Sequence, residues 1–377
     1  MRILHVGMGW FGEEVGGLAR VMTQAVLAQD AAGHQARALV TGSGAVPGLS
    51  GRRARAFAPP DAPLPERMKG VRSALSAELS SFDPEVVSFH FALYARPVLG
   101  RVAGKRPWMM HFHGPWALEG LAEGAGRFRA FALRRLVEMP VYRSAPVVVA
   151  LSEAFGGILR REYGVRPERI RIVQGGFDPA PFLAAPDRPR ARLQLGLPAD
   201  RPLAVCVRRL ASRMGLENLI DAVGLLRERH PDLLVAVAGK GPLRSELEDR
   251  IRQSGLGESV RLLGFVPESD LPALYAAADF SVVPTVALEG FGLIVAESLA
   301  SGTPVVATRV GALPELLSGF TPELLAEPTA VDVARAMERA MAADVPGREA
   351  CRAHAARWSW DAVVPGLMDA YRAAGAR

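Results

Sequence analysis

The amino-acid sequence predicts an α/β protein made of two doubly wound, Rossmann-like domains joined by a hinge. Short runs rich in valine, isoleucine and leucine alternate with helix-like segments, as in parallel sheets that helices cover on both faces. A proline-dense stretch over 177–202 interrupts this alternation, and a second series begins after it. The chain has 377 residues, which is too long for one ordinary hydrophobic core.

The hydrophobic pattern also predicts where the individual elements lie. In the first half, strands are expected at 3–8, 35–40, 86–90, 108–113, 147–151 and 170–173, with a helix over 18–32. In the second half, strands are expected at 203–207, 233–238, 260–263, 280–283 and 304–307, with helices at about 216–229, 243–254, 270–278 and 292–300. We therefore predict domains over 1–178 and 179–359. Ligands of such sheets bind beyond the carboxyl ends of the strands, so a cleft between the two sheets is the expected site.

Composition excludes several classes of protein. A hydrophobic fraction of 49% and a charged fraction of 22% are typical of a folded chain. The two cysteines, Cys206 and Cys351, exclude a disulfide framework, and no Cys/His cluster has the spacing of metal ligands, so no metal site is predicted. No apolar stretch reaches the ~18 residues of a membrane span, and no signal-peptide pattern begins the chain, which favours a cytoplasmic location.

The net charge of +6 comes mostly from arginine. Nucleic-acid binding is not predicted, because basic residues are not interleaved with aromatic ones. A basic amphipathic stretch over 127–135 could rest on anionic membrane lipid or bind a phosphorylated acceptor, although a solvated helix face is the simpler interpretation. Peripheral contact with the inner membrane face is therefore one expectation.

A glycine pattern near the N-terminus offers one functional hypothesis. Gly7, Gly9 and Gly12 fit G-x-G-x-x-G directly after a strand, which is typical of a dinucleotide site in an NAD(P)-dependent oxidoreductase. Helical periodicity, however, begins only after Gly16 and Gly17, and the second predicted strand does not end in the acidic residue that would bind a ribose. Gly16 and Gly17 would instead offer backbone amides to a phosphate at the helix start, or form a simple turn.

The most informative segment lies in the second half, between 280 and 306. It reads as strand, glycine turn, helix and strand, with Glu289 just before the turn and Glu297 inside the helix. Gly290 and Gly292 would let a ligand approach the backbone, and the helix N-terminus offers amides to an anion. Two carboxylates that flank such an anion site would suit the hydroxyls of a nucleotide sugar.

This segment resembles the E-G-F-G-L-x-x-x-E signature of glycosyltransferase family 4, whose members are retaining enzymes with the two-domain GT-B fold. The resemblance extends over nearly the whole chain, through segments that match in order and spacing. These are Gly16-Gly17, His113-Gly114, Ser152-Glu153, Arg208-Arg-Leu-Ala-Ser-Arg-Met-Gly215 (family pattern G-R-L-x-x-x-K-G), Gly239-Lys-Gly241, Gly264-Phe-Val266 and Gly302-Thr-Pro304. It also implies that a last helix, over about 360–377, crosses back to the first domain.

The resemblance implies a role for each matching residue. Glu297 would bind the ribose of the nucleotide, Glu289 the hydroxyls of the donor sugar, and Arg209 the diphosphate as its bond to the sugar breaks. His113 would lie beside the donor sugar. The remaining donor-site residues would contribute backbone amides, phosphate contacts or the base pocket: Gly16, Gly17, Gly239, Phe265, Val266, Gly290, Phe291, Gly292 and Leu293.

One position departs from the family pattern. Met214 occupies the place of the lysine that gives the diphosphate a second positive charge, and methionine cannot supply one. Our hypothesis is that the adjacent Arg213 replaces that lysine while Met214 packs inward. The alternatives are a weakened diphosphate site or a non-catalytic, sugar-nucleotide-binding relative.

Three histidines of the first domain also need interpretation. His113 ends a predicted strand, where ligands bind, and is predicted to be functional. His111 is predicted to point to the opposite face of the sheet and to be structural. His90 ends the neighbouring predicted strand and shares the face of His113, which suggests a supporting or acceptor contact.

The predicted reaction is the transfer of a hexose-type sugar from a nucleotide diphosphate, UDP- or GDP-linked, to a hydroxyl of a glycan, a lipid-linked acceptor or a small molecule. The resemblance implies retention of anomeric configuration without a metal or other cofactor. In keeping with this, the chain contains no Asp-x-Asp motif that would hold a divalent ion at the diphosphate.

Overall fold

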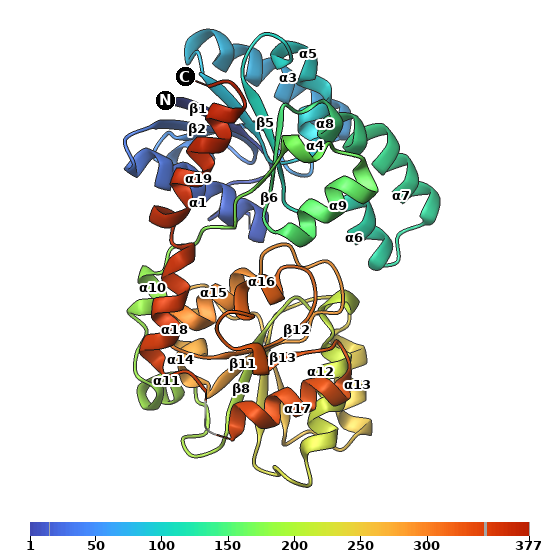
Figure 1. Cartoon of the computed structure of the whole chain (residues 1–377), viewed down its shortest axis with the longest axis vertical. Helices are drawn as coiled ribbons and strands as arrows, with labels where there is room; N and C mark the ends of the chain where they lie inside the picture. The colour runs from blue at the N-terminus through green and yellow to red at the C-terminus, as the bar shows by residue number, and fades with distance from the viewer. Residues whose placement is uncertain (15, 343–344, 377) are drawn as a thin grey trace. The chain divides into compact units, whose positions relative to one another are not determined.

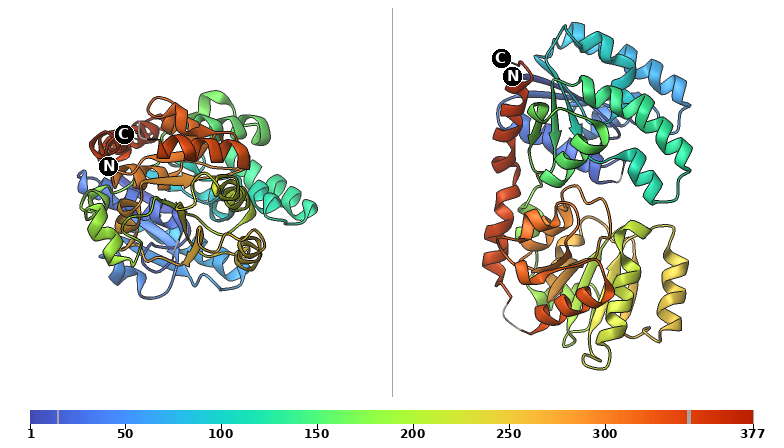
Figure 2. Two further views of the ribbon diagram at one scale, coloured as in Figure 1. Left: turned by 90° about the horizontal axis from the view of Figure 1, so that it is seen from below. Right: turned by 45° about the vertical axis from the view of Figure 1, so that its right-hand side comes forward.

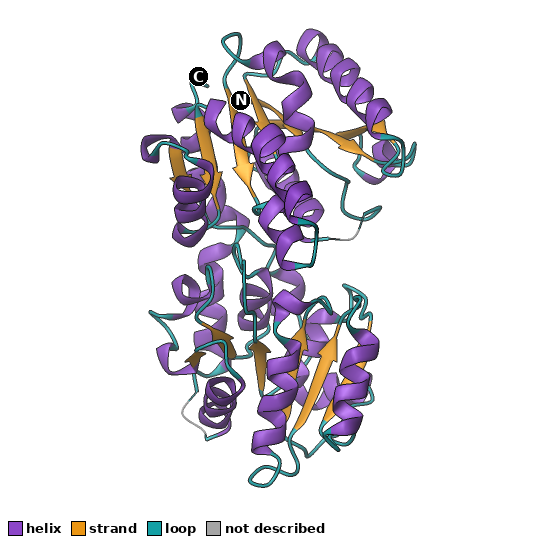
Figure 3. Ribbon diagram, turned by 90° about the vertical axis from the view of Figure 1, so that its right-hand side faces the viewer, coloured by secondary structure: helices purple, strands orange, loops and turns teal. Residues whose placement is uncertain are grey.

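A computed structural model describes residues 1–14, 16–342 and 345–376. The chain forms two compact units. The first unit comprises Met1–Leu121, Ala125–Phe177 and Trp358–Arg377, and the second unit comprises Ala122–Gly124 and Asp178–Arg357. Each unit contains a twisted sheet with helices on its faces, as Figure 1 and Figure 3 show.

The described part of the first unit holds a seven-stranded parallel sheet in the order β3-β2-β1-β4-β5-β6-β7. Its strands are β1 Arg2–Val6, β2 Gln35–Thr41, β3 Ala54–Ala58, β4 Val86–Phe89, β5 Trp108–Phe112, β6 Val147–Ala150 and β7 Ile170–Ile172. Strand β6 reads Val-Val-Val-Ala and is buried throughout, because helices cover both faces of the sheet and no polar alternation is needed.

Helices connect these strands or cover the sheet. They are α1 Gly17–Ala31, α2 Val46–Leu49, α3 Leu64–Ser81, α4 Ala92–Ala95, α5 Leu99–Val102, α6 Trp116–Ala122, α7 Arg127–Leu133, α8 Met139–Ser144, α9 Glu153–Tyr163 and α19 Trp360–Ala373, with 3-10 turns at Arg96–Val98, Pro167–Arg169 and Ala356–Trp358 and a π-helical turn at Arg134–Glu138. Ser152 is the N-cap of α9, and its hydroxyl accepts a hydrogen bond from the amide of Phe155 at 3.2 Å.

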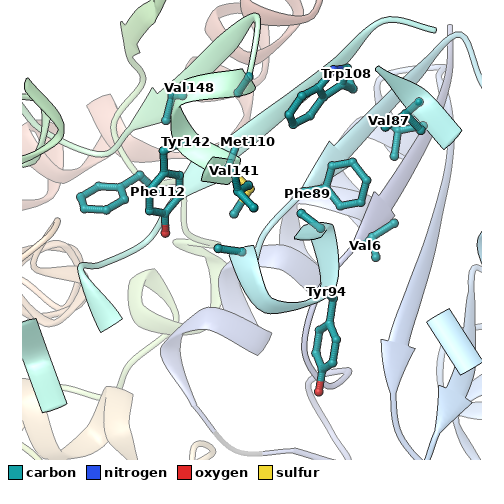
Figure 4. Packing of buried hydrophobic residues seen from close by; sticks show 14 of the residues in the cluster. Val6, Val87, Phe89, Tyr94, Trp108, Met110, Phe112, Val141, Tyr142 and Val148 are labelled. Carbon is teal, nitrogen blue, oxygen red and sulfur yellow. The ribbon is translucent and has the colours of Figure 1, made fainter. Parts of the chain in front are cut away.

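Aromatic and aliphatic side chains fill one side of the first sheet (Figure 4). Phe112 meets Tyr142 edge to face, with ring centroids 5.2 Å apart. The other side is covered in part by α19, which packs through Val363, Val364 and Leu367 in one cluster with Ile3 and other strand residues. The N-terminal strand and the C-terminal residues of the chain consequently lie side by side (Figure 2).

The described part of the second unit holds a six-stranded parallel sheet in the order β10-β9-β8-β11-β12-β13. Its strands are β8 Leu203–Val207, β9 Leu234–Ala238, β10 Val260–Gly264, β11 Phe280–Val283, β12 Val305–Thr308 and β13 Leu325–Ala326. Its helices are α10 Ala180–Leu183, α11 Arg188–Gln194, α12 Leu216–Leu226, α13 Arg244–Gln253, α14 Leu271–Ala277, α15 Leu293–Ala300, α16 Leu313–Leu317, α17 Ala330–Met341 and α18 Arg348–Ala355, with 3-10 turns at Ser212–Met214 and Pro322–Leu324.

The predicted fold class is confirmed, and the predicted strands and helices occur close to their expected bounds. Two strands were not predicted. β3 reads Ala-Arg-Ala-Phe-Ala and lies at the sheet edge, and β13 has only two residues, so neither carries a clear apolar run. The predicted last helix over 360–377 ends at Ala373, and Arg377 lies outside the described residues.

The strand order of each sheet reverses at one point, between β1 and β4 in the first unit and between β8 and β11 in the second. Strands on the two sides of such a point are followed by helices that lie on opposite faces, which opens a crevice at their carboxyl ends. The residues after these four strands are therefore the first place to look for ligand-binding groups.

Candidate functional site

The second unit gathers the predicted donor-site residues along one edge of its sheet. Arg208 and Arg209 follow β8, Gly239 follows β9, Phe265 follows β10, and Glu289 lies in the loop after β11. Since β10, β9, β8 and β11 are neighbours and parallel, their carboxyl ends meet at the same edge. The structure therefore brings these predicted residues of the second unit together at its switch point.

Close backbone packing joins the loops at this edge. The amide of Arg208 donates to the carbonyl of Ala238 at 2.8 Å, and the amide of Gly239 donates to the carbonyl of Gly264 at 2.7 Å. A β-carbon on Gly239, whose φ is +149°, would lie 1.8 Å from the carbonyl oxygen of Arg208. Only glycine fits there, so this residue holds the loop after β9 against the loop after β8.

The glycine turn leads directly into helix α15. Gly292 caps the helix with a left-handed φ of +88°, and Leu293 is the first helical residue. The backbone amides at such a start have no partner within the helix and carry the positive end of its dipole. The turn thus supplies amide donors beside Glu289, as the sequence predicts for an anion cradle.

Glu297 lies one turn inside α15 and is almost fully buried, with 1% of its surface exposed. The hydroxyl of Tyr275 donates a hydrogen bond to its Oε2 at 3.2 Å. Tyr275 belongs to α14 and is itself buried. This contact orients the carboxyl group.

Arg208 is a site residue that the sequence reasoning missed. Its guanidinium pairs with the carboxylate of Glu289 and also bonds to the hydroxyl of Thr285. The side chains of Arg208 and Glu289 are only 9% and 13% exposed. In the quoted family pattern this position is a glycine, so the pattern contains no signal for a charged residue here.

The backbone next to Glu289 is unusual as well. Leu288 has a φ of +57°, a conformation that side-chain-bearing residues rarely adopt. The amide of Ala312 donates to the carbonyl of Glu289 at 3.0 Å, and the Arg213 guanidinium donates to the carbonyl of Leu288 at 3.1 Å. These bonds hold the chain in the turn that directs Glu289 to its partner.

Arg209 and Arg213 form a cationic pair at the same edge. The carboxylate of Glu123, in the short segment Ala122–Gly124 of the second unit, binds Arg209 at 2.7 Å and Arg213 at 3.1 Å. The two guanidiniums can thus hold two oxygens of one anion. Met214 is buried in the core of the second unit, in keeping with the inward packing expected of it.

A half-exposed aromatic ring follows β10. The ring of Phe265 is 49% exposed, and the ammonium of Lys240 lies 4.9 Å from its centre. Val266, the next residue, is partly buried. This loop offers an open apolar surface of the kind that a nucleotide base can cover.

In the first unit, the glycine-rich segment after β1 does not have the arrangement of a dinucleotide site. Helix α1 begins at Gly17, with Gly16 as its N-cap, rather than at Gly12. The carboxylate of Glu14 accepts a hydrogen bond from the amide of Gly9 at 2.8 Å and fills the space beside it. A pyrophosphate would need that space. The start of α1 at Gly16 and Gly17 agrees with the predicted helix N-terminus.

The structure corrects the prediction for His111. His90, His111 and His113 lie together in the first unit, with His90 stacked on His111 at a centroid distance of 4.2 Å. His111 therefore does not point to the opposite face of the sheet. Residues two apart on a strand share a face, so His111 and His113 are on the same side. His90 does share their face, as predicted.

The three clustered histidines are electrically neutral, with His90 and His111 buried and His113 partly buried. Burial lowers the pKa of His5 and of His113 to about 4, and burial next to other imidazoles holds the pKa of His90 and His111 well below the usual value. Next to the three clustered rings lies a small apolar cavity lined by Val21, Val149, Trp360 and Leu367, among others. These imidazoles can accept or donate hydrogen bonds near pH 7, but they carry no charge.

Two doubly wound units, one with carboxylates and arginines around a glycine turn at its switch point, define the GT-B class of α/β proteins. The family model described as "Glycosyltransferase Family 4" matches residues 15–181, and that described as "Glycosyl transferases group 1" matches residues 187–358. The chain belongs to this family of glycosyltransferases.

A D-inositol 3-phosphate glycosyltransferase from Acidothermus cellulolyticus is 31% identical over 305 residues, which are 76% of this chain and 67% of that protein. The fold is shared with sucrose-phosphate synthase from Thermosynechococcus elongatus (TM-score 0.79, 24% identity, 98% of both chains). It is also shared with the Anabaena protein HepE, solved in complex with UDP and glucose (TM-score 0.77, 20% identity, 97% of this chain and 98% of that chain).

The chain spans roughly half the length of several other curated relatives, between 44% and 59%. Among the described residues, no helix combines the length and the apolar character that crossing a membrane requires.

Proposed function

We propose that this protein is a retaining glycosyltransferase that moves a hexose-type sugar from a nucleotide diphosphate, UDP- or GDP-linked, to a hydroxyl acceptor. The observation that carries this proposal is the convergence of Glu289, Glu297, the α15 N-terminus and three arginines at the switch point of the second unit. The named activities of its relatives and the UDP bound by the Anabaena protein support it.

In this proposal the two glutamates recognise hydroxyl groups. Glu297 accepts hydrogen bonds from the ribose, because a carboxylate can accept two bonds from vicinal hydroxyls. Glu289 accepts from hydroxyls of the donor sugar, with Arg208 holding it in place. The amides of Phe291, Gly292 and Leu293 bind the sugar and the diphosphate.

The arginines act on the leaving group. Arg209 and Arg213 neutralise the nucleoside diphosphate as the glycosidic bond breaks, with Arg213 replacing the lysine of the family pattern. The paired contact of both guanidiniums with Glu123 supports this assignment, since a diphosphate offers similarly spaced oxygens. Gly16 and Gly17 of the first unit contribute amides to the phosphates.

The base lies in the pocket of Gly239, Phe265 and Val266. His113 accepts a hydrogen bond from a hydroxyl of the donor sugar. The departing phosphate removes the proton from the acceptor hydroxyl on the same face of the sugar, which retains the anomeric configuration. The transition state resembles an oxocarbenium ion.

Ligand binding and turnover test this proposal. UDP, GDP and ADP are compared with NAD(H) in thermal-shift measurements, and nucleotide sugars are then screened for transfer, with NMR of the product's anomeric proton. We expect one nucleoside diphosphate to raise the melting temperature and the product to keep the donor's configuration. Stabilisation by NAD(H) alone, or an inverted product, would contradict the proposal.

Glu297 provides a sharper test. Replacing Glu297 by Gln removes charge-assisted hydrogen bonds to the ribose, each worth about 1.5–3 kcal/mol, so nucleotide affinity should fall about tenfold or more. Titration calorimetry with the stabilising nucleotide measures this. Glu258→Gln, at an exposed turn after α13, is the control and should bind as the wild type does.

The non-catalytic alternative makes a different prediction. A binding protein would bind the nucleotide sugar but neither transfer nor hydrolyse it, and Glu289→Ala would change affinity alone. If wild type turns over the donor and Glu289→Ala does not, the alternative is excluded. Unchanged diphosphate affinity in Arg213→Ala would exclude the replacement of the lysine by Arg213.

We further propose that the first unit contacts anionic lipid through α7 and the following π-helical turn. Phe128, Phe131 and Leu136 are 84%, 63% and 67% exposed. Arg127, Arg129 and Arg135 are exposed beside them. Exposed rings that enter the interface while arginines contact phosphates are typical of peripheral membrane helices. Helix α7 is labelled in Figure 1.

Vesicle sedimentation tests the lipid contact. Wild type should bind vesicles of phosphatidylcholine with phosphatidylglycerol better than phosphatidylcholine alone, and Phe128→Ala with Phe131→Ala should lose this binding. Leu193→Ala, which removes an equally exposed apolar residue from the second unit, is the matched control. Equal binding by wild type and the double variant would contradict the proposal.

A further inference from the structure

A continuous chain of hydrogen bonds connects His113 with helices α1 and α19 inside the first unit. Gln29 of α1 donates from Nε2 to the hydroxyl of Tyr371 at 3.0 Å, and its Oε1 lies 2.9 Å from Nε2 of His5. Nδ1 of His5 lies 2.8 Å from Nε2 of His90, and Nδ1 of His90 lies 2.9 Å from Nε2 of His113. Gln29, His5, His90 and Tyr371 are all buried, with at most 2% of their surfaces exposed.

Once the donor and the acceptor of the first hydrogen bond are assigned, only one placement of the imidazole protons satisfies the other bonds. A neutral imidazole carries one N–H, so it donates through one nitrogen and accepts through the other. His5 and His90 each form hydrogen bonds through both ring nitrogens, and His113 forms one through Nε2. Reversing one proton would place two N–H groups or two lone pairs face to face, and therefore all three rings must point the same way.

Gln29 sets the direction. Its carbonyl oxygen faces His5, so Nε2 of His5 must carry the proton and Nδ1 must accept. His90 then donates from Nε2 to His5, and His113 donates from Nε2 to His90. In this orientation of the side chain, the Gln29 amide nitrogen donates to the hydroxyl of Tyr371. The proton of His113 is therefore on Nε2, and its Nδ1 keeps a lone pair.

We propose that Gln29, His5 and His90 are positioning residues that hold His113 as the Nε2–H tautomer, so that its Nδ1 serves as a hydrogen-bond acceptor for a hydroxyl of the bound sugar. The identity of the sugar rests on the proposed function. The tautomer does not, because it follows from the hydrogen bonds of the first unit alone.

A neutral acceptor suits the chemistry of sugar transfer. The anomeric carbon gains positive charge as the phosphate departs, so an imidazolium beside the sugar would raise the energy of the transition state. A nitrogen lone pair has the opposite effect. The buried rings of His90 and His111 beside His113 also disfavour its protonation, because the charge would be taken out of water next to two uncharged rings.

His90, His111 and His113 lie close enough to one another to be considered as ligands of one metal ion. The potential ligand atoms of His90, His111 and His113 lie within 4.8 Å of one another. The rings, however, are stacked, with interplanar angles of 9° for His90 and His111 and 12° for His111 and His113. Imidazole lone pairs lie in the ring plane, so stacked rings do not direct them at one ion. Both nitrogens of His90 are also occupied by histidine partners.

Nitrogen NMR reads the tautomer directly and needs no substrate. In protein labelled with ¹⁵N-histidine, long-range ¹H–¹⁵N spectra distinguish Nε2–H from Nδ1–H rings, and the spectrum of His113→Asn identifies the signals of His113. We expect His113 to be a single Nε2–H tautomer in the wild type. An Nδ1–H pattern, or displacement of the Nε2 proton by stoichiometric Zn²⁺, would overturn the proposal.

A substitution of Gln29, the residue that sets the direction of the hydrogen bonds, tests the positioning role. Gln29→Met removes the group that sets the direction, so both tautomers of His113 should appear. Once a donor is known, kcat should fall about two- to tenfold, following the lost Nε2–H fraction. Gln24→Met is the matched control: it removes another hydrogen bond between α1 and α19, from Trp360 Nε1 to Gln24 Oε1 at 3.2 Å, but should leave the tautomer unchanged.

The two readouts separate the possible failures. A single Nε2–H tautomer in Gln29→Met, or the same mixture in Gln24→Met, would overturn the role of Gln29. If the tautomer changes as expected but the wild type turns over no nucleotide sugar, the proposed function fails. The positioning of His113 by Gln29, His5 and His90 then still holds.

Discussion

The Arg208 guanidinium and the Glu289 carboxylate form an ion pair in which both side chains are largely shielded from water. Arg208 follows β8 and Glu289 follows β11, so the pair bridges the two strands that flank the switch point of the second sheet. Removing one partner of such a pair leaves the other charge buried without compensation. The pair therefore links the stability of this edge to the geometry of the proposed sugar site.

Replacing Arg208 by Met should destabilise the second unit by about 3–5 kcal/mol, since the Glu289 charge would lose its partner. All five tryptophans lie in the first unit, so hydrogen exchange of the β8 and β11 amides is the suitable measurement. Arg335→Met, which breaks an exposed pair with Asp332, is the control and should cost less than about 1 kcal/mol. Equal protection in both variants would show that the Arg208 pair contributes little.

Gly239→Ala should disrupt the same edge of the sheet through a steric clash with the backbone. The added methyl group would lie 1.8 Å from the carbonyl oxygen of Arg208, so the loops after β8 and β9 must separate. We expect loss of nucleotide binding and faster exchange of the Arg208 amide. Gly257→Ala, at a glycine with no heavy atom within 4 Å of the new carbon, should stay within about 0.5 kcal/mol of the wild type. Retained binding in Gly239→Ala would be inconsistent with this packing.

The histidine cluster should make the first unit sensitive to acid. Its pKa values are lower in the folded than in the unfolded chain, so the unfolded chain binds more protons as pH falls. The neutral rings contribute their full stabilisation to the folded state above pH 6.5. This stabilisation is lost as pH falls towards 4, and the loss is about 3 kcal/mol each for His5 and His113. Urea unfolding followed by tryptophan fluorescence measures this.

His111→Phe isolates one member of the cluster. Nε2 of His111 has no hydrogen-bond partner within the described part of the chain, so phenylalanine should preserve the stacking and remove one titrating group. Its loss of stability between pH 6.5 and 4 should be shallower than in the wild type. His34→Gln, at a partly exposed position after α1, is the control. An identical acid slope in His111→Phe would contradict the assignment.

The comparison of sequence with structure shows which features a pattern can predict. The two-unit fold and the turn before α15 follow from periodicity and glycine placement, which are local properties. The ion pair of Arg208 joins residues 81 positions apart, and the contact of His5 with His90 joins residues 85 apart. Such contacts depend on strand order, which periodicity does not specify. The alternation of side chains along a strand is enough to place His111 on the same face as His113. Our prediction of the opposite face was therefore wrong.

A buried glutamate of the first unit should act in the opposite pH direction from the histidines. Burial raises the pKa of Glu138 to about 7, although the Tyr163 hydroxyl donates to its Oε2 at 3.0 Å and the Ala117 amide donates at 3.3 Å. The folded chain therefore holds a proton that the unfolded chain releases near pH 4.5. Stability falls as pH rises from about 4.5 through 7, by about 3 kcal/mol in total.

Glu138→Gln keeps an acceptor for Tyr163 but cannot ionise. It should be more stable than the wild type at pH 8, by up to about 3 kcal/mol, and about equally stable at pH 5. Urea unfolding followed by tryptophan fluorescence at both pH values measures the difference. Glu162→Gln removes a half-exposed carboxylate that pairs with Arg134 and should shift stability by less than about 1 kcal/mol at either pH. A Glu138→Gln variant that is less stable than the wild type at pH 8 would mean that the ionised carboxylate is stabilised where it lies, and that its pKa is not raised.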